Sequence, residues 1–276
     1  MLPSYLLSLR EGIEAALIIG IVLGALRQMR RLEFAPVVWL GVTAATLLSI
    51  VAGVILTLLG MSFEGTAEQI FEGITMLLAA GVLTWMIFWM SSQARNIKGD
   101  LENNVHRATQ DGGKGGLFML ALLAVLREGV ELALFLSAST FATNAQQTIL
   151  GAILGLGTAI LLGWSLFATT IRLDLRRFFK FTGFLLILFA AGLVAHGIHE
   201  FNEAGWIPSI IENFWDVNAL LDENSIAGQI LKALFGYNGN PSLSEVLGYL
   251  LYFGAIFFGL RMIRQQKPET VTRVQA

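Results

Sequence analysis

The chain contains no cysteine and only three histidines, His106, His196 and His199, among its 276 residues. The lack of cysteine excludes disulfide bonds, iron–sulfur clusters and thiolate metal sites. Any metal site therefore has to rely mainly on carboxylate oxygens. The sequence also has no Walker motif for nucleotide phosphates. We therefore expect that the chain does not itself hydrolyse ATP. We also expect a protein that is not an enzyme, has no permanently bound cofactor and binds no nucleic acid.

Charged residues are scarce as well, at 14% of the chain against about 25% in a typical soluble domain. Hydrophobic residues make up 55%, and the mean hydropathy is +0.68. This composition predicts an all-α, polytopic membrane protein with a single domain, residues 1–276, surrounded by lipid. Seven segments are long enough to cross a bilayer: Leu2–Leu26, Pro36–Leu59, Glu68–Met90, Gly116–Phe141, Thr148–Thr170, Phe181–Asn202 and Glu245–Ile263.

Outside the predicted spans, basic residues are concentrated in alternate connections, and Lys232 is the exception, in the mostly acidic outer connection. The others follow the first, third, fifth and seventh segments: Arg27, Arg30, Arg31, Arg95, Lys98, Arg107, Lys114, Arg172, Arg176, Arg177, Lys180, Arg261, Arg264, Lys267 and Arg273. The other connections carry Glu64, no charge, or a mostly acidic group. The positive-inside rule then predicts an outer N-terminus and a cytoplasmic C-terminus. Trp85 and Trp89, near the predicted inner face, are typical of interfacial anchors.

One short motif occurs twice, as Leu9-Arg10-Glu11-Gly12-Ile13-Glu14 and as Leu126-Arg127-Glu128-Gly129-Val130-Glu131. Each copy places an arginine and two glutamates inside a predicted span, where an ionisable group costs about 2.5–3.5 kcal/mol. On a helix the two glutamates of each copy point the same way, and each arginine can reach the second glutamate, four residues on. Small residues run beside this charged stripe and allow helices to pack closely.

The two copies belong to an internal repeat. The motifs are 117 residues apart (127 − 10), and a second pair of similar stretches, at 78–83 and 189–194, is 111 apart (189 − 78). Two units of three spans, about 1–91 and 116–204, follow each other, so the second unit is inverted. The outer connection, about 205–244, and a seventh helix, about 245–263, follow. Inverted repeats usually hold their substrate near the midplane.

Two interpretations of the motifs are open from the residues alone. Arg10 and Arg127 could clamp two helices together as ion pairs, but four glutamates against two arginines leave a formal charge of −2. We favour an oxygen-lined site for a hard cation, in which the arginines support the carboxylates. The predicted metal ligands are Glu11, Glu14, Glu128 and Glu131.

A second group of polar residues lies at the predicted outer ends of the third and sixth spans: Glu68, Glu72, His199, Glu200 and Glu203. These side chains could collect the cation before it reaches the central site, or they could simply be wetted by the outer solution. The outer connection has apolar residues at helical spacing, so we expect short helices on the outer surface. They form either an interfacial cap or a docking site for a partner.

Paired Arg-Glu-Gly-x-Glu motifs in the first and fourth of seven spans resemble the oxidase-dependent iron transporter family, which includes fungal high-affinity iron permeases and bacterial EfeU-type permeases. The Ile70–Gly73 and Leu83–Met90 stretches and the Glu203-Ala204-Gly205 end are also similar to the bacterial branch. The resemblance implies uptake of iron, as Fe³⁺, across the inner (cytoplasmic) membrane. It implies that Glu11, Glu14, Glu128 and Glu131 bind the iron. It also implies partners on the outer side: a multicopper ferroxidase in fungi, and an iron-binding protein and a haem peroxidase in bacteria.

Other functions remain possible on the residues alone. Carboxylates do not distinguish hard cations, so the same glutamates could carry Mn²⁺ or act as proton relays in a coupled carrier. A membrane scaffold or sensor that transports nothing is a third possibility, which the excess of acid in the motifs disfavours. The chain could also form a homo-oligomer.

Overall fold

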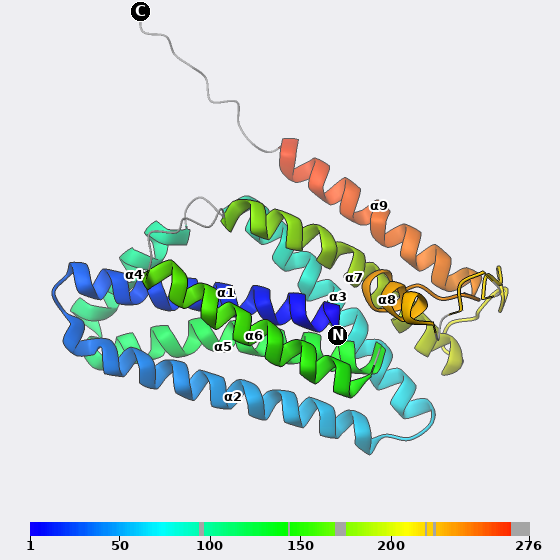
Figure 1. The fold of residues 1–276 in the computed structure, drawn as a ribbon, viewed down its shortest axis with the longest axis horizontal. Helices are drawn as coiled ribbons and strands as arrows, with labels where there is room; N and C mark the ends of the chain where they lie inside the picture. The colour runs from blue at the N-terminus through cyan, green and yellow to red at the C-terminus, as the bar shows by residue number, and fades with distance from the viewer. Residues whose placement is uncertain (94–96, 143, 169–174, 219, 223–224, 266–276) are drawn as a thin grey trace, which may run out of the picture.

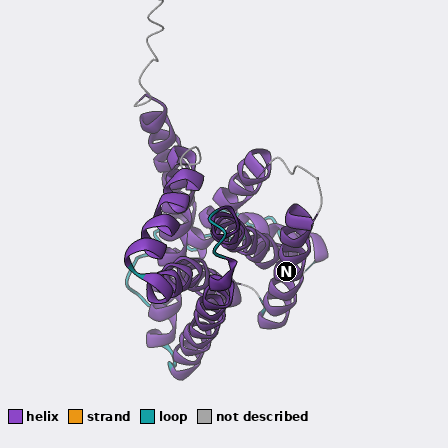
Figure 2. Cartoon of the chain, turned by 90° about the vertical axis from the view of Figure 1, so that its left-hand side faces the viewer, coloured by secondary structure: helices purple, strands orange, loops and turns teal. Residues whose placement is uncertain are grey.

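The computed structural model describes residues 1–93, 97–142, 144–168, 175–218, 220–222 and 225–265. Some of the basic residues that support the predicted orientation, Arg95, Arg172, Lys267 and Arg273, lie outside this part. The elements are α1 (Leu2–Gln28), η1 (Leu32–Phe34), α2 (Ala35–Ser62), α3 (Thr66–Gln93), α4 (Ile97–Asp111), α5 (Gly113–Ala142), α6 (Ala145–Ala168), α7 (Leu175–Glu203), α8 (Ile226–Phe235) and α9 (Leu243–Gln265). Within these ranges helices are the only regular secondary structure, as Figure 2 shows in an end-on view.

Long helices run roughly along one axis of the molecule, and successive ones point in opposite directions (Figure 1). Five of them, α2, α3, α6, α7 and α9, are long and apolar enough to cross a membrane. The other two, α1 with 27 residues and α5 with 30, also exceed the length that a bilayer requires, but each carries the three charges of a motif. The described part of the chain is therefore that of a polytopic integral membrane protein.

The helices pack in pairs that mirror one another. Helix α1 packs on α6, α2 packs on α5, α3 packs on α7, and α1 and α5 meet each other. When α1, α2 and α3 are matched to α5, α6 and α7, the α1–α6 pair corresponds to the α5–α2 pair. The α3–α7 and α1–α5 pairs each correspond to themselves. A buried core of Leu7, Met76, Phe135 and Leu193 joins the four helices α1, α3, α5 and α7. This arrangement places both motif helices at the centre of the bundle.

Two connections differ from the sequence-based expectation. Residues 97–111, in the connection between the third and fourth predicted spans, form helix α4, which the sequence analysis did not predict. Leu101, Val105 and Ala108 pack one face of it against α1 and α5. His106 on this helix is exposed.

The outer connection contains a single described helix, α8, instead of several. Ser225 caps its N-terminus, and Gly236 ends it with φ of +65°. The apolar residues between 206 and 218 are not helical, because their backbone bonds to the segment before α9. Phe214 N donates to Pro241 O at 2.9 Å, and Val217 N donates to Gly239 O at 2.8 Å.

The glycine of each motif lies where a neighbouring helix approaches most closely. A Cβ added at Gly12 would lie 2.6 Å from Ala159 Cβ on α6, and one added at Gly129 would lie 2.6 Å from Ser49 Cβ on α2. Real Cβ atoms do not approach this closely, so both positions need glycine for the helices to pack as they do. The small-residue stripe predicted from the sequence therefore contacts α6 on one motif helix and α2 on the other.

Moving one methyl group from α6 to α1 at their contact tests this packing. Gly12→Ala should lower the midpoint of thermal unfolding in detergent by about 2–8 °C, because overpacking costs more than the helix propensity that alanine gains. Adding Ala159→Gly should restore most of the loss. The matched control is Gly24→Ala on the same helix, where nothing lies within 4 Å and stability should be unchanged or higher. Equal effects at Gly12 and Gly24 would contradict the close contact.

Candidate metal centre

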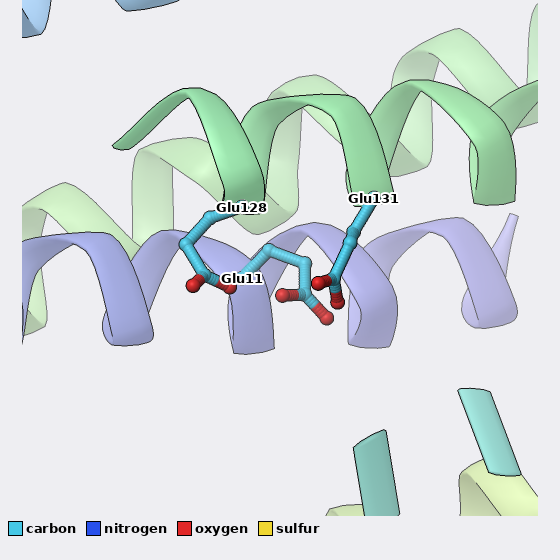
Figure 3. Close-up of side chains that lie close together, drawn as sticks. All are labelled: Glu11, Glu128 and Glu131. Carbon is cyan, nitrogen blue, oxygen red and sulfur yellow. The ribbon is translucent and has the colours of Figure 1, made fainter. Parts of the chain in front are cut away.

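The contact between α1 and α5 brings three motif carboxylates together. Glu11 points from α1, and Glu128 and Glu131 point from α5, toward one common space (Figure 3). One oxygen from each of the three lies within 4.8 Å of the others. Glu14, the fourth glutamate predicted as a ligand, does not belong to this group. The helical spacing of the motif therefore orients its glutamates as expected, while the packing selects three of the four.

Each arginine pairs with the second glutamate of its own motif. Arg10 Nε donates to Glu14 Oε1 at 3.0 Å, and Arg127 Nε donates to Glu131 Oε1 at 3.0 Å. The spacing of four residues predicted both contacts. Glu14 is thus held by Arg10, while Glu131 keeps its other oxygen, Oε2, buried and without a hydrogen-bond partner among the described residues.

The two arginines are in different surroundings. Arg10 is almost fully buried, with 1% of its side chain exposed, whereas 43% of the Arg127 side chain is exposed. The guanidinium of Arg127 lies over the ring of Trp89 on α3, at 4.8 Å from the ring centroid. The two halves of the site are therefore supported differently, although their sequences are alike.

Glu11 is the most exceptional member of the group. It is buried, and neither of its carboxylate oxygens has a hydrogen-bond partner in the part of the chain that is described. Glu128, beside it, is also buried. An isolated ionised carboxylate is very costly in an apolar environment unless it is paired or coordinates a metal. The unpartnered oxygens of Glu11 thus indicate a site that is completed by a cation or by protons.

The spacing of the three oxygens is close to what a cation requires. Two carboxylate oxygens at 2.0–2.2 Å on opposite sides of an ion lie about 4.0–4.4 Å apart. The oxygens of Glu11, Glu128 and Glu131 lie within 4.8 Å of one another, which exceeds this distance by less than about 1 Å. Rotation of the side chains can close this difference. With carboxylates and no thiolate or imidazole in the group, the ligand set suits hard cations.

A cavity of about 810 Å³ adjoins this centre. Glu11 and Glu128 form part of its wall, and the rest of the wall comes from α1, α2, α5 and α6. It reaches Leu58 near the end of α2, Thr140 near the end of α5 and Ala145 at the start of α6, which lie at the same end of the molecule (Figure 1). The wall is mainly apolar, with hydroxyl groups from Thr46, Ser49, Thr57, Ser137, Thr140 and Thr148. The cavity thus extends from the carboxylates toward the end of the bundle that carries α8.

The second predicted group of residues forms two overlapping sets, because Glu200 interacts electrostatically with His199 and Glu203 as well as with Glu68. Glu72 and Glu200 are half-buried and within electrostatic reach of each other and of exposed Glu68. His199 instead contacts Glu245 on α9, with Nδ1 at 3.0 Å from Oε1, while its Nε2 lies 3.2 Å from Glu203 Oε1. A polar cavity of about 430 Å³ includes His199, Glu203 and Glu245 but none of the first three glutamates.

Several residues at these sites are absent from the sequence-based prediction. Glu245 is buried and also accepts hydrogen bonds from Asn238 and Ser242, so it ties the outer connection to α7 and α9. Ser49 packs against the motif glycine of α5, and Trp89 covers Arg127. Only the fold reveals these three, because each acts through a residue distant in the sequence.

Comparison with known proteins identifies the family of the chain. A sequence profile of the Iron permease FTR1 family matches residues 1–269, nearly the whole chain. The chain belongs to the FTR1 iron permease family. Both motifs lie within the matched region, as do α1–α9. The family resemblance predicted from the motifs is thereby confirmed, together with iron as the kind of substrate that the family transports.

Curated relatives agree with this assignment. The chain is 39% identical over 254 residues to the "Ferrous iron permease EfeU" of Escherichia coli O157:H7, covering 91% of this chain and 92% of that protein. It is 34% identical over 254 residues to the protein of the same name from Yersinia pestis, with 91% and 90% covered. No solved structure matches the chain.

The different burial of the two arginines leads to unequal effects of their removal. Arg10→Ala leaves Glu14 as an uncompensated buried charge and should cost about 3–5 kcal/mol of stability. Arg127→Ala should cost clearly less, because that pair is partly exposed and screened. Lysine should replace Arg10 poorly, because it lacks the planar fork of the guanidinium. Unfolding of the purified variants in detergent measures the difference, and equal losses for both alanine variants would contradict the structural asymmetry.

Proposed function

We propose that this protein imports iron across the cytoplasmic membrane and that the iron binds, as Fe³⁺, between α1 and α5. Glu11, Glu128 and Glu131 supply the primary ligands, and Glu14 joins them only if it leaves Arg10. The observation that carries this proposal is the buried carboxylate of Glu11, whose oxygens have no hydrogen-bond partner among the described residues and face two further carboxylates. Membership of the iron permease family supports iron as the cation.

The net charge of the site suits an ion that binds and is then released. Two arginines offset two of the four motif glutamates and leave a formal charge of −2, so bound Fe³⁺ brings the group to about +1. This small net charge disfavours permanent retention of the ion, and an all-oxygen ligand set suits a hard cation. Fe²⁺ is the second candidate, favoured by the relatives, which are named ferrous iron permeases. Uptake of radioactive iron from a ferric chelate and from iron kept reduced by ascorbate distinguishes the two.

We also propose that seven helices span the membrane, α1, α2, α3, α5, α6, α7 and α9, and that α1–α3 and α5–α7 form an inverted repeat. The mirrored packing pairs and the alternating helix directions support this arrangement. The N-terminus then lies outside and the C-terminus in the cytoplasm. The end that carries α8 and Glu68, Glu72, Glu200 and Glu203 faces the iron source, where negative charge raises the local cation concentration.

Reporter fusions test this orientation. A reporter that works only in the cytoplasm should be active when it is fused after Gln275, because the basic connections stay on the cytoplasmic side. A reporter that works only outside the membrane should be active when it is inserted near Asn218. A C-terminal reporter that reads as external would reverse the assignment of outer and inner ends.

Replacing single ligands by glutamine tests the site itself. Glutamine keeps the shape and one carbonyl oxygen of the side chain but removes the charge. Glu11→Gln and Glu128→Gln should each lower the rate of iron uptake into proteoliposomes by at least about tenfold, the loss that corresponds to 1.4 kcal/mol. The control is Glu33→Gln, in η1, where the side chain is exposed and pairs only with Arg31 at the surface.

The amount of protein inserted in the membrane must be equal in all these variants. Wild-type iron uptake by either Glu11→Gln or Glu128→Gln would show that the motifs pack helices and do not bind the ion. Comparing Fe³⁺, Fe²⁺, Mn²⁺ and Zn²⁺ in the same assay would show whether the site prefers iron. A higher rate for Mn²⁺ than for either form of iron would favour another hard cation as the substrate.

A further inference from the structure

The contact between Trp89 and Arg127 connects helix α3 to the metal centre. The Arg127 guanidinium lies 4.8 Å from the centroid of the Trp89 ring, within the range of a cation–π contact. The same guanidinium donates to Glu131 Oε1 at 3.0 Å, and Glu131 is one of the three clustered carboxylates. A chain of direct contacts therefore runs from the Trp89 ring through Arg127 to a proposed iron ligand.

The two arginines of the site have different surroundings. Arg10, the equivalent arginine on α1, is held on all sides by protein, with 1% of its side chain exposed. Arg127 is 43% exposed, and the repeat offset of 111 places Glu200, an acidic residue, at the position equivalent to Trp89 (89 + 111). Arg127 therefore lacks the tight packing that fixes Arg10.

We propose that Trp89 is a positioning residue of the iron site, which holds Arg127 and, through it, Glu131 in the geometry that binds the ion. This inference rests on the proposed function of the carboxylate group. A long arginine side chain that is partly exposed has many rotamers, and most of them remove Nε from Glu131. The flat ring of Trp89 restricts the guanidinium to one plane and leaves its edge free to donate to the carboxylate.

Without the ring, Arg127 spends less time on Glu131, and Glu131 is less often oriented toward Glu11 and Glu128. The effect falls mainly on the affinity for iron, because no ligand is removed. Trp89 thus has a different role from Trp85, one turn earlier on α3, which is 68% exposed on the bundle surface. Trp85 provides a matched control of the same residue type on the same helix.

The experiment measures initial rates of iron uptake into proteoliposomes over a range of iron concentrations. Trp89→Ala should raise the half-saturating concentration by about 2- to 30-fold, the range that a cation–π contact corresponds to, with a smaller change in the maximal rate. Trp89→Phe should recover most of the affinity because it keeps an aromatic face. Trp89→Leu, which keeps bulk without the ring, should behave like Trp89→Ala. Trp85→Ala should match the wild type.

A double-mutant cycle with Arg127→Gln separates positioning from a purely structural role. If Trp89 acts through Arg127, Trp89→Ala should cause no further rise in the half-saturating concentration in the Arg127→Gln protein. Equal effects in the two backgrounds, wild-type kinetics of Trp89→Ala, or equal behaviour of the phenylalanine and leucine variants would overturn the proposal. Failure of the proposed function is distinct, because then Glu11→Gln itself would transport iron at the wild-type rate.

Discussion

The cost of burying carboxylates in a membrane protein is the constraint on which the structure depends. Glu11 and Glu128 sit at the contact of the two central helices, and the Glu11 carboxylate finds no hydrogen-bond partner within the described residues. Such a group destabilises the folded protein unless a cation, a proton or an arginine compensates it. The motif supplies one arginine for every two glutamates, so the arginines neutralise only half of the negative charge. A cation that enters the site neutralises the remaining charge, which gives a physical reason for binding.

The rest of the bundle keeps the carboxylates in range of one another. Gly12 lets α6 approach α1, and Gly129 lets α2 approach α5, so the motif helices are held from their outer sides. Arg10 is fixed by burial, while Arg127 relies on Trp89. The cavity beside Glu11 and Glu128 is open and is lined mainly by apolar side chains, several of them exposed, and it extends toward the end of the bundle that carries α8. Packing and charge thus converge on the same pair of helices.

Much of this architecture follows from the sequence, and the exceptions have physical causes. Long apolar segments determine their own helices, so the first predicted span, Leu2–Leu26, is close to the observed Leu2–Gln28. Helix α4 was missed because only three apolar residues define its buried face. The residues between 206 and 218 have helical spacing but bond to the segment before α9 instead.

Within the site, helical periodicity predicted that Arg10 reaches Glu14 and that Arg127 reaches Glu131. Periodicity treats all four glutamates alike, however, whereas in the fold only Glu11, Glu128 and Glu131 bring oxygens within 4.8 Å of one another and Glu14 pairs with Arg10. The different surroundings of Trp85 and Trp89 are likewise invisible in the sequence, because both lie near the same end of one helix. Contacts between helices far apart in the chain therefore account for the features that the motif alone did not reveal.

The most direct measurement is the location of iron in crystals of the protein soaked with an iron salt, by anomalous diffraction at the iron absorption edge. The account predicts an anomalous peak between α1 and α5, within coordination distance of Glu11, Glu128 and Glu131. A peak only near His199 and Glu203, with none between the motif helices, would contradict it.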